Sequence, residues 1–220
     1  MRVISRGLAA LLALFAVAGF AAGTEPFQLD KEYKLVGERS PPTDPKKVTV
    51  QEFFWYGCPV CKGFEPTLNT WLKKKPGYVN FERVPNTLGR DVGELHQRAF
   101  YVAMTLGIED KIHAAMFEGL KNVEKGDPTL TTPQEIDALF VKDGGAKPGQ
   151  FLSMQNSFAI GGSVHRADQL AMSYGITGTP TIVVDGRWMT GTGEAGGYDK
   201  LPAVIDFLVE KARAERGIAK

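Results

Sequence analysis

Residues 48–61 read Val-Thr-Val-Gln-Glu-Phe-Phe-Trp-Tyr-Gly-Cys-Pro-Val-Cys, and this stretch decides the fold class. Its first half is mostly β-branched or aromatic, which is typical of a buried strand. Pro59 suits the first turn of a helix, where its missing N–H costs nothing. Phe64, Leu68 and Leu72 follow at helical spacing. A strand therefore runs into a helix, expected over residues 59–74, and the two cysteines lie at the junction.

The segments around this junction predict the rest of a small α/β unit. Residues 78–84 alternate in polarity and predict a second strand, so the unit begins strand–helix–strand. Residues 181–189 predict two further strands, because Asp185-Gly186 is a hairpin turn signal between apolar runs. An amphipathic helix is expected after them, at about residues 201–209.

Residues 91–173 contain no strand signal. Apolar residues at helical spacing predict helices around 99–106, 112–120 and 136–140, and further helices at 151–158 and 164–174. The middle of the chain is therefore expected to be a helical block inserted into a four-stranded α/β unit.

The N-terminus has the organisation of a secretory signal peptide, placed here at residues 1–23. Arg2 and Arg6 precede an uncharged run from Leu8 to Ala22 that ends in small residues. The alternative, an uncleaved membrane anchor, is disfavoured because the run is shorter than the roughly 20 apolar residues that span a bilayer. The mature protein is expected in an exported compartment that permits disulfides.

Composition excludes several classes of protein. The chain has 220 residues, of which 43% are hydrophobic and 23% charged, as in an ordinary globular protein. Lys and Arg number 26 against 25 Asp and Glu, so no basic field is available to recruit nucleic acid. The two cysteines are too few for a disulfide framework, so their role is local.

The Cys58–Cys61 pair is predicted to be a redox dithiol. A thiolate at Cys58 would lie at a helix N-terminus, where free N–H groups and the helix dipole favour an anion. Cys61, one turn further on, would serve as the more buried resolving thiol. A zinc site lacks two further ligands, haem attachment requires a histidine where Lys62 stands, and a merely structural pair would be oxidised on export.

Gly178-Thr179-Pro180 precedes the third predicted strand. Proline cannot continue a central strand, so Pro180 either opens the strand in the ordinary trans form or follows a cis bond in a special turn. A cis bond would bring this backbone beside the dithiol, where its free edge would hold a peptide by strand addition. Position alone leaves both forms open, with base rates on the side of trans.

Three stretches together resemble the DsbA-type thiol:disulfide oxidoreductases. They are residues 52–61 with Phe64-Glu65, residues 175–180 with 183–186, and residues 103–110 with 116–119. The resemblance implies a thioredoxin fold with an inserted all-helical domain and a cis bond before Pro180. It also implies a periplasmic monomer without a cofactor that oxidises unfolded exported proteins, and reoxidation by a DsbB-like membrane quinone oxidoreductase. The expected parts are residues 24–89 and 166–220 for the thioredoxin-like domain and 90–165 for the helical domain.

The resemblance also places acids at Glu52 and Glu65. Glu52 lies in an apolar strand, where an acid is costly unless it is paired or functional, and it is expected to exchange protons with Cys61. The alternative for both residues is an ordinary solvated carboxylate. Val60 departs from the family, because many members have histidine there. Histidine can donate to a Cys58 thiolate and valine cannot, so Cys58 is expected to be less acidic than in those relatives.

Other signals carry less weight. Gly191–Gly196 matches GxGxxG but leaves too little chain for a dinucleotide site, and it is interpreted as a flexible turn. His96, His113 and His165 are interpreted as surface or helix-face residues. The alternatives to a dithiol oxidase are a reductase or isomerase, and a peptide-binding chaperone with an incidental disulfide. A dimeric isomerase is disfavoured because too little chain precedes Cys58 for a dimerisation domain.

Overall fold

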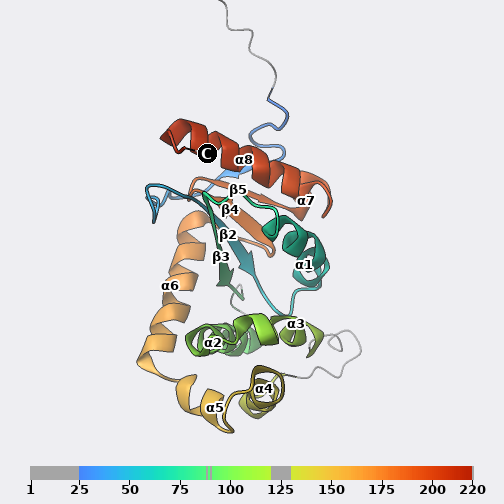
Figure 1. Cartoon of the computed structure of the whole chain (residues 1–220), viewed down its shortest axis with the longest axis vertical. Coiled ribbons are helices and arrows are strands. Elements are labelled where there is room, and N and C mark those ends of the chain that lie inside the picture. The colour runs from blue at the N-terminus through green and yellow to red at the C-terminus, as the bar shows by residue number, and fades with distance from the viewer. Residues whose placement is uncertain (1–24, 88, 90, 120–129, 220) are drawn as a thin grey trace, which may run out of the picture.

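The computed structural model describes residues 25–87, 89, 91–119 and 130–219, so the predicted signal peptide lies outside the described residues. The described chain forms a five-stranded sheet with strand order β1-β5-β4-β2-β3 (Figure 1). Strand β2 (Val48–Phe54) is buried along its whole length. Strand β3 (Val79–Pro85) runs parallel to it, and β4 (Thr181–Val184) lies antiparallel on its other side.

The hairpin predicted at Asp185-Gly186 joins β4 to β5 (Trp188–Gly191). Both turn residues have positive φ, 54° at Asp185 and 58° at Gly186, and this geometry favours an Asp-Gly pair. A fifth strand, β1 (Lys34–Leu35), pairs antiparallel with β5 at the sheet edge. It was not expected, because two residues are too few to show a periodic pattern.

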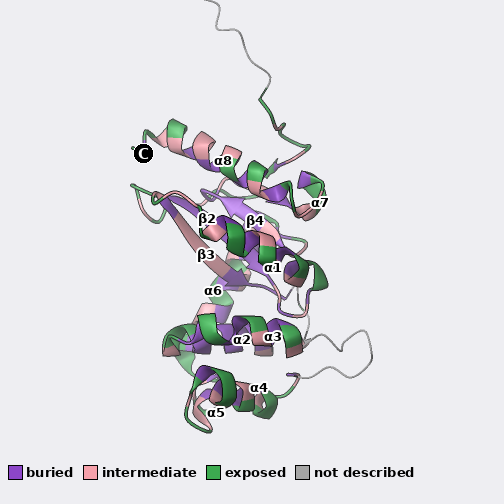
Figure 2. Ribbon diagram, turned by 45° about the vertical axis from the view of Figure 1, so that its right-hand side comes forward, coloured by how far each residue is buried: buried purple, intermediate pink, exposed green. Residues whose placement is uncertain are grey.

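Helices cover both faces of the sheet. Helices α1 (Pro59–Leu72) and α8 (Leu201–Arg216) pack their apolar sides on one face. The second half of α6 (Phe158–Tyr174) packs on the other face, where Ala171 and Tyr174 join Phe53 and Val183 in a common cluster. Figure 2 shows the corresponding division of α8 between a buried side toward the sheet and an exposed side.

The helical block lies at one end of the sheet (Figure 1). It contains α2 (Asp91–Leu106), α3 (Glu109–Gly119), α4 (Pro133–Leu139), a π-helical turn η2 (Phe140–Gly144), α5 (Gln150–Met154) and the first half of α6. Its core is continuous with the end of β2, because Phe54, Tyr56, Cys58 and Cys61 belong to the same apolar cluster. The cysteines therefore lie where the two parts of the molecule meet.

Two local expectations were wrong. The helices expected at 151–158 and 164–174 are divided differently: α5 ends at Met154, and α6 begins at Phe158 because the Ser157 side chain accepts from the N–H of Ile160 and caps it. The predicted boundary after residue 165 therefore falls inside one continuous helix. Residues 192–195, expected in a flexible turn, form the short helix α7 (Thr192–Ala195), which ends at Gly196 with φ of 78°.

None of the helices in the described ranges is both long and apolar enough to cross a membrane.

Candidate active site

Cys58 caps the N-terminus of α1. Its extended backbone (φ −92°, ψ 113°) ends the segment that leaves β2, and Pro59 opens the helix. The Cys58 Sγ accepts a hydrogen bond from the backbone N–H of Cys61 at 3.4 Å. The sulfur thus takes the place of the oxygen in an ordinary N-cap, at the end of the helix dipole that favours negative charge. The predicted position of Cys58 at a helix start is confirmed.

The two cysteines, both free thiols here, have opposite acid–base properties. The largest effect on the pKa of Cys58 is the side-chain hydrogen bond with Cys61, which lowers it. Burial raises this pKa and a hydrogen bond with Thr179 lowers it, and the resulting pKa is about 5. Burial raises the pKa of Cys61 far above its usual range. Cys58 is 8% exposed and Cys61 is fully buried. At neutral pH the pair is therefore one accessible thiolate and one buried neutral thiol.

The loop before β4 lies against the Cys58 sulfur. The Thr179–Pro180 peptide bond is cis, as the resemblance implied. When protonated, the Cys58 thiol donates to the carbonyl oxygen of Thr179 at 3.2 Å. The Thr181 hydroxyl donates to the carbonyl of Gly178 at 2.8 Å and closes the loop. Four predicted site residues, Cys58, Cys61, Thr179 and Pro180, are thus brought together from segments about 120 residues apart in sequence.

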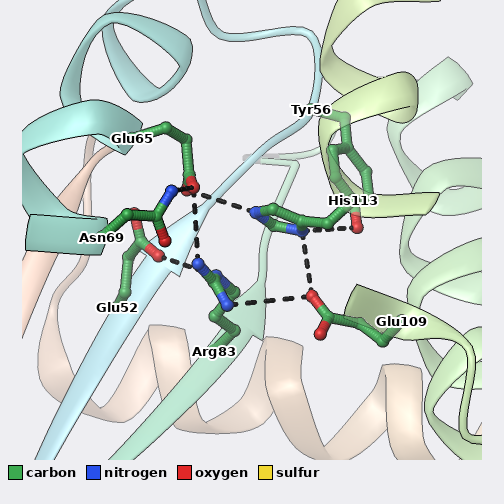
Figure 3. A network of polar contacts seen from close by, with 7 residues as sticks. All are labelled: Glu52, Tyr56, Glu65, Asn69, Arg83, Glu109 and His113. Carbon is green, nitrogen blue, oxygen red and sulfur yellow. Dashed lines mark hydrogen bonds and ion pairs between the residues drawn. The ribbon is translucent and has the colours of Figure 1, made fainter. Parts of the chain in front are cut away.

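Behind the dithiol lies a buried charge cluster, defined here as Glu52, Glu65, Arg83, Glu109 and His113 (Figure 3). Arg83, opposite Glu52 in the β2–β3 register, is its centre. Its guanidinium lies 3.5 Å from Glu52 Oε2, 3.4 Å from Glu65 Oε2 and 3.8 Å from Glu109 Oε1. The cluster therefore joins β2, α1, β3 and α3.

His113 is the second basic group of the cluster. Its Nε2 lies 3.2 Å from Glu65 Oε1, and its Nδ1 lies 3.0 Å from both Glu109 Oε1 and the Tyr56 hydroxyl (Figure 3). Burial lowers the pKa of His113, but the contacts with Glu109 and Glu65 outweigh it and the pKa is raised. Burial likewise raises the pKa of Glu65 and of Glu109, yet His113 and Arg83 outweigh it and both values are lowered.

Glu52 behaves differently from the other two acids. It is fully buried, and burial, reinforced by the charge of Glu65, raises its pKa to about 8 against the opposing effect of Arg83 and His113. Neither of its carboxyl oxygens has a hydrogen-bond partner among the described residues. The charge of Glu52 in turn raises the pKa of Cys61. Glu52 is therefore a neutral acid at pH 7 that is electrostatically coupled to the buried thiol.

His96 and His113 were interpreted as surface or helix-face residues, and they lie on helices α2 and α3 on sides that face the interior. Both are buried, at 1% and 7% exposure, because their rings find polar partners inside. His96 accepts from Trp55 Nε1 at 3.2 Å and its other nitrogen lies 2.9 Å from the carbonyl of Leu130; burial lowers its pKa, so it is neutral. His165 is exposed, as expected.

Sequence reasoning missed Arg83, Glu109 and His113. Arg83 had a usable signal, since a basic residue in the strand parallel to β2 is available to compensate an acid buried in it. Glu109 and His113 are four residues apart and share a face of α3, but nothing in the sequence shows that this face turns toward Glu65.

Two cavities border the buried charge cluster. One of about 370 Å³, between α1 and α3, is lined by Glu65, Arg83 and His113 among others. The second, of about 460 Å³, is lined by residues of β3, Arg83 among them, by residues of α2 and α6, and by Glu109. Both open beside charged groups, so the cluster is close to solvent although its members are mostly buried. A larger cavity of about 680 Å³, between α1 and α8, contains none of the predicted site residues.

Comparison with known proteins agrees with this geometry. Residues 49–200 match the model of the DSBA-like thioredoxin domain family. The chain is 39% identical over 207 residues to the Pseudomonas aeruginosa "Thiol:disulfide interchange protein DsbA", covering 94% of this chain and 96% of that protein. It is 36% identical to the Burkholderia cepacia protein of the same name, covering 97% and 96%.

Solved structures give the same result. The crystal structure of Pseudomonas aeruginosa DsbA superposes with a TM-score of 0.79 at 37% identity, over 88% of this chain and 98% of that one. The oxidoreductase DsbA from Xylella fastidiosa superposes with a TM-score of 0.74 at 28% identity, over 83% and 96%. With its dithiol at the start of α1, its cis Thr179–Pro180 loop and its helical insertion, the chain belongs to the DsbA family of thioredoxin-fold thiol:disulfide oxidoreductases.

Proposed function

We propose that this protein is a periplasmic dithiol oxidase, which donates a Cys58–Cys61 disulfide to newly exported proteins. The supporting observation is the Cys58 sulfur, which caps α1 and has its pKa lowered to about 5. A thiolate that is stable in the reduced protein is a good leaving group and makes the disulfide ready to be given away.

The proposed reaction has two steps. A substrate thiolate attacks the Cys58 sulfur of the Cys58–Cys61 disulfide, which forms a mixed disulfide and releases Cys61. A second substrate thiolate then attacks the substrate sulfur of the mixed disulfide and releases the Cys58 thiolate. Two electrons pass from the substrate dithiol to the enzyme, and the products are a substrate disulfide and reduced Cys58 and Cys61.

Each remaining site residue has a proposed role. Glu52, neutral at pH 7, donates a proton to Cys61 as that sulfur leaves and accepts it when the disulfide forms again. Glu65 anchors Arg83, which lies against Glu52, and also holds His113. Thr179 and Pro180 present a backbone edge beside Cys58, on which an extended substrate peptide pairs by strand addition. Replacing Glu52 with Gln is expected to slow turnover; an unaltered rate and pH profile would favour a structural carboxyl.

The compartment and partners follow from the same proposal. The leader at residues 1–23 directs the chain to the periplasm, where it acts as a monomer on unfolded exported proteins. A DsbB-like membrane quinone oxidoreductase then reoxidises the dithiol. The protein itself uses no cofactor in this scheme, because the electrons pass directly between sulfur atoms.

The test is oxidation of a reduced two-cysteine peptide by the oxidised protein. We expect stoichiometric peptide disulfide from the natural chain and none from Cys58→Ser. Suppression of aggregation that survives in Cys58→Ser would instead support the chaperone. Equilibration with glutathione decides the direction of electron flow, since a potential as low as that of thioredoxin would support a reductase.

A further inference from the structure

The buried charge cluster has an uneven number of charges. It contains three carboxyl groups, on Glu52, Glu65 and Glu109, and two basic groups, on Arg83 and His113. Unmatched charge is expensive in a buried site, so two carboxylates balance the two cations and the third carboxyl keeps its proton. The direct contacts of His113 go to Glu65 and Glu109, which leaves fully buried Glu52 as the third.

We propose that His113, carried by α3 of the helical insertion, is a positioning residue for disulfide exchange: its imidazolium pairs with Glu65 and Glu109, and its positive charge leaves Glu52 able to ionise and so to exchange a proton with Cys61. The inference rests on the proposed function, because that function gives the proton of Glu52 its role in disulfide exchange. The electrostatic effect of His113 on Glu52 is a property of the folded protein alone.

The groups that face His113 from each surrounding element determine the sign of the effect. They are Tyr56 from the segment after β2, Glu65 from α1, Arg83 from β3 and Glu109 from its own helix. The positive charge of His113 lowers the pKa of Glu52, whereas the negative charges of Glu65 and Glu109 raise it. Removing the His113 charge therefore moves the titration of Glu52 upward, and removing the Glu109 charge moves it downward.

This charge balance affects one step of the chemistry. When the disulfide forms again, the Cys61 thiol loses its proton to an ionised Glu52 and attacks Cys58 in a mixed disulfide, which releases the other thiolate. If the Glu52 titration rises by about one unit, its ionised fraction at pH 7 falls about tenfold. Ring closure by Cys61 slows by the same factor, while attack by the Cys58 thiolate does not change.

The experiment compares the natural chain with His113→Gln, His113→Lys and Glu109→Gln. Carbon-13 NMR of labelled glutamate follows the Glu52 carboxyl against pH, with Glu52→Gln to assign its signal. Mass spectrometry follows the mixed disulfide that reduced protein forms with oxidised glutathione. We expect an upward shift of the Glu52 titration and accumulated mixed disulfide in His113→Gln. In Glu109→Gln we expect a downward shift of the Glu52 titration and less mixed disulfide. In His113→Lys we expect both quantities to stay near those of the natural chain.

Several results would overturn the proposal. One is that the Glu52 titration and the closure rate are the same in His113→Gln and in the natural chain. Another is that His113→Lys behaves like His113→Gln, and a third is that Glu109→Gln shifts the Glu52 titration in the same direction as His113→Gln. Each would mean that the ring has only a packing role. If His113→Gln does not fold, His113→Lys and Glu109→Gln still show in which direction a charge at these positions moves the Glu52 titration. Failure of the proposed function is separate, because a protein that oxidises no peptide still gives a measurable Glu52 titration.

Discussion

At the scale of the residue, two identical side chains three positions apart have opposite chemistry. Cys58 receives the N–H groups of a helix start, whereas Cys61 lies inside an apolar cluster shared by α1 and the helical insertion. Both differences follow from the strand–helix junction, so the sequence predicted them. The pKa of Glu52 is raised by burial and by the charge of Glu65 against the opposing charges of Arg83 and His113, and this arrangement was not visible in the sequence.

The stability of the reduced protein is predicted to depend on the ionisation of Cys58. Its pKa is about 5 when folded, against an ordinary value of 9.0. A lowered folded pKa stabilises the fold fully above the unfolded value, and this stabilisation is lost as the pH falls through the folded value. The stability of the reduced over the oxidised form should thus decline from about pH 9 to pH 5, by at most about 1.4 kcal/mol per unit. Urea unfolding of both forms at several pH values measures this; a constant difference would contradict it.

A second prediction concerns Val60, which is 38% exposed in the first turn of α1. Replacing Val60 with His adds a donor near the Cys58 sulfur and is expected to lower its pKa further. Each unit corresponds to about 1.4 kcal/mol and roughly 30 mV in a two-electron couple. Thiolate absorbance against pH measures the change, with Val60→Asn as a control that adds polarity without a cationic ring. An unchanged or higher pKa in Val60→His would exclude the idea.

At the scale of the element, helices and strands were predictable where their residue pattern or their first residues gave a clear signal. Helix α4 begins where Thr132 and Glu135 form a reciprocal capping box, and this start was visible in the sequence. Strand β2 was equally clear, because most of its residues are β-branched or aromatic and all are buried. Strand β1 and helix α7 were missed because elements of two and four residues are too short for a hydrophobic pattern to repeat.

The capping box gives a prediction at this scale. Replacing Thr132 with Ala removes the side-chain acceptor for the N–H of Glu135 and is expected to cost about 1 kcal/mol of unfolding free energy. Thr70→Ala is the matched control, because that exposed hydroxyl bonds within α1 and caps nothing. The midpoint of urea unfolding gives both values. Equal effects of the two substitutions would show that the cap contributes nothing specific.

At the scale of the whole molecule, the active site is built jointly by two parts of the chain. The sequence predicted the inserted helices and their order, because helical periodicity is local. It did not predict which face of α3 meets the sheet, because contacts such as Tyr56 to His113 join residues 57 positions apart. The dithiol and its loop were therefore foreseen, and the contribution of the insertion to the site was not.

Phe54 is predicted to stabilise the packing of the helical insertion against the end of the sheet. It is fully buried at the end of β2, and its ring packs against Tyr56, Phe100, His113 and Phe117. Replacing Phe54 with Ala is expected to cost about 3–5 kcal/mol. Met104→Ala, at a position that is 55% exposed in α2, should change stability little. Denaturant unfolding compares the two, and a loss below about 1 kcal/mol in Phe54→Ala would show that the parts are held together elsewhere.

The difference in accessibility between the two sulfur atoms also determines which of them reacts with peroxide in the reduced protein. Only Cys58 presents a thiolate near solvent, so sulfenic acid forms there and not on fully buried Cys61. The thiol behind it condenses with the sulfenic acid and releases water, which gives the Cys58–Cys61 disulfide. Oxidative damage is thereby diverted into the working form of the enzyme before it proceeds to the irreversible sulfinic acid.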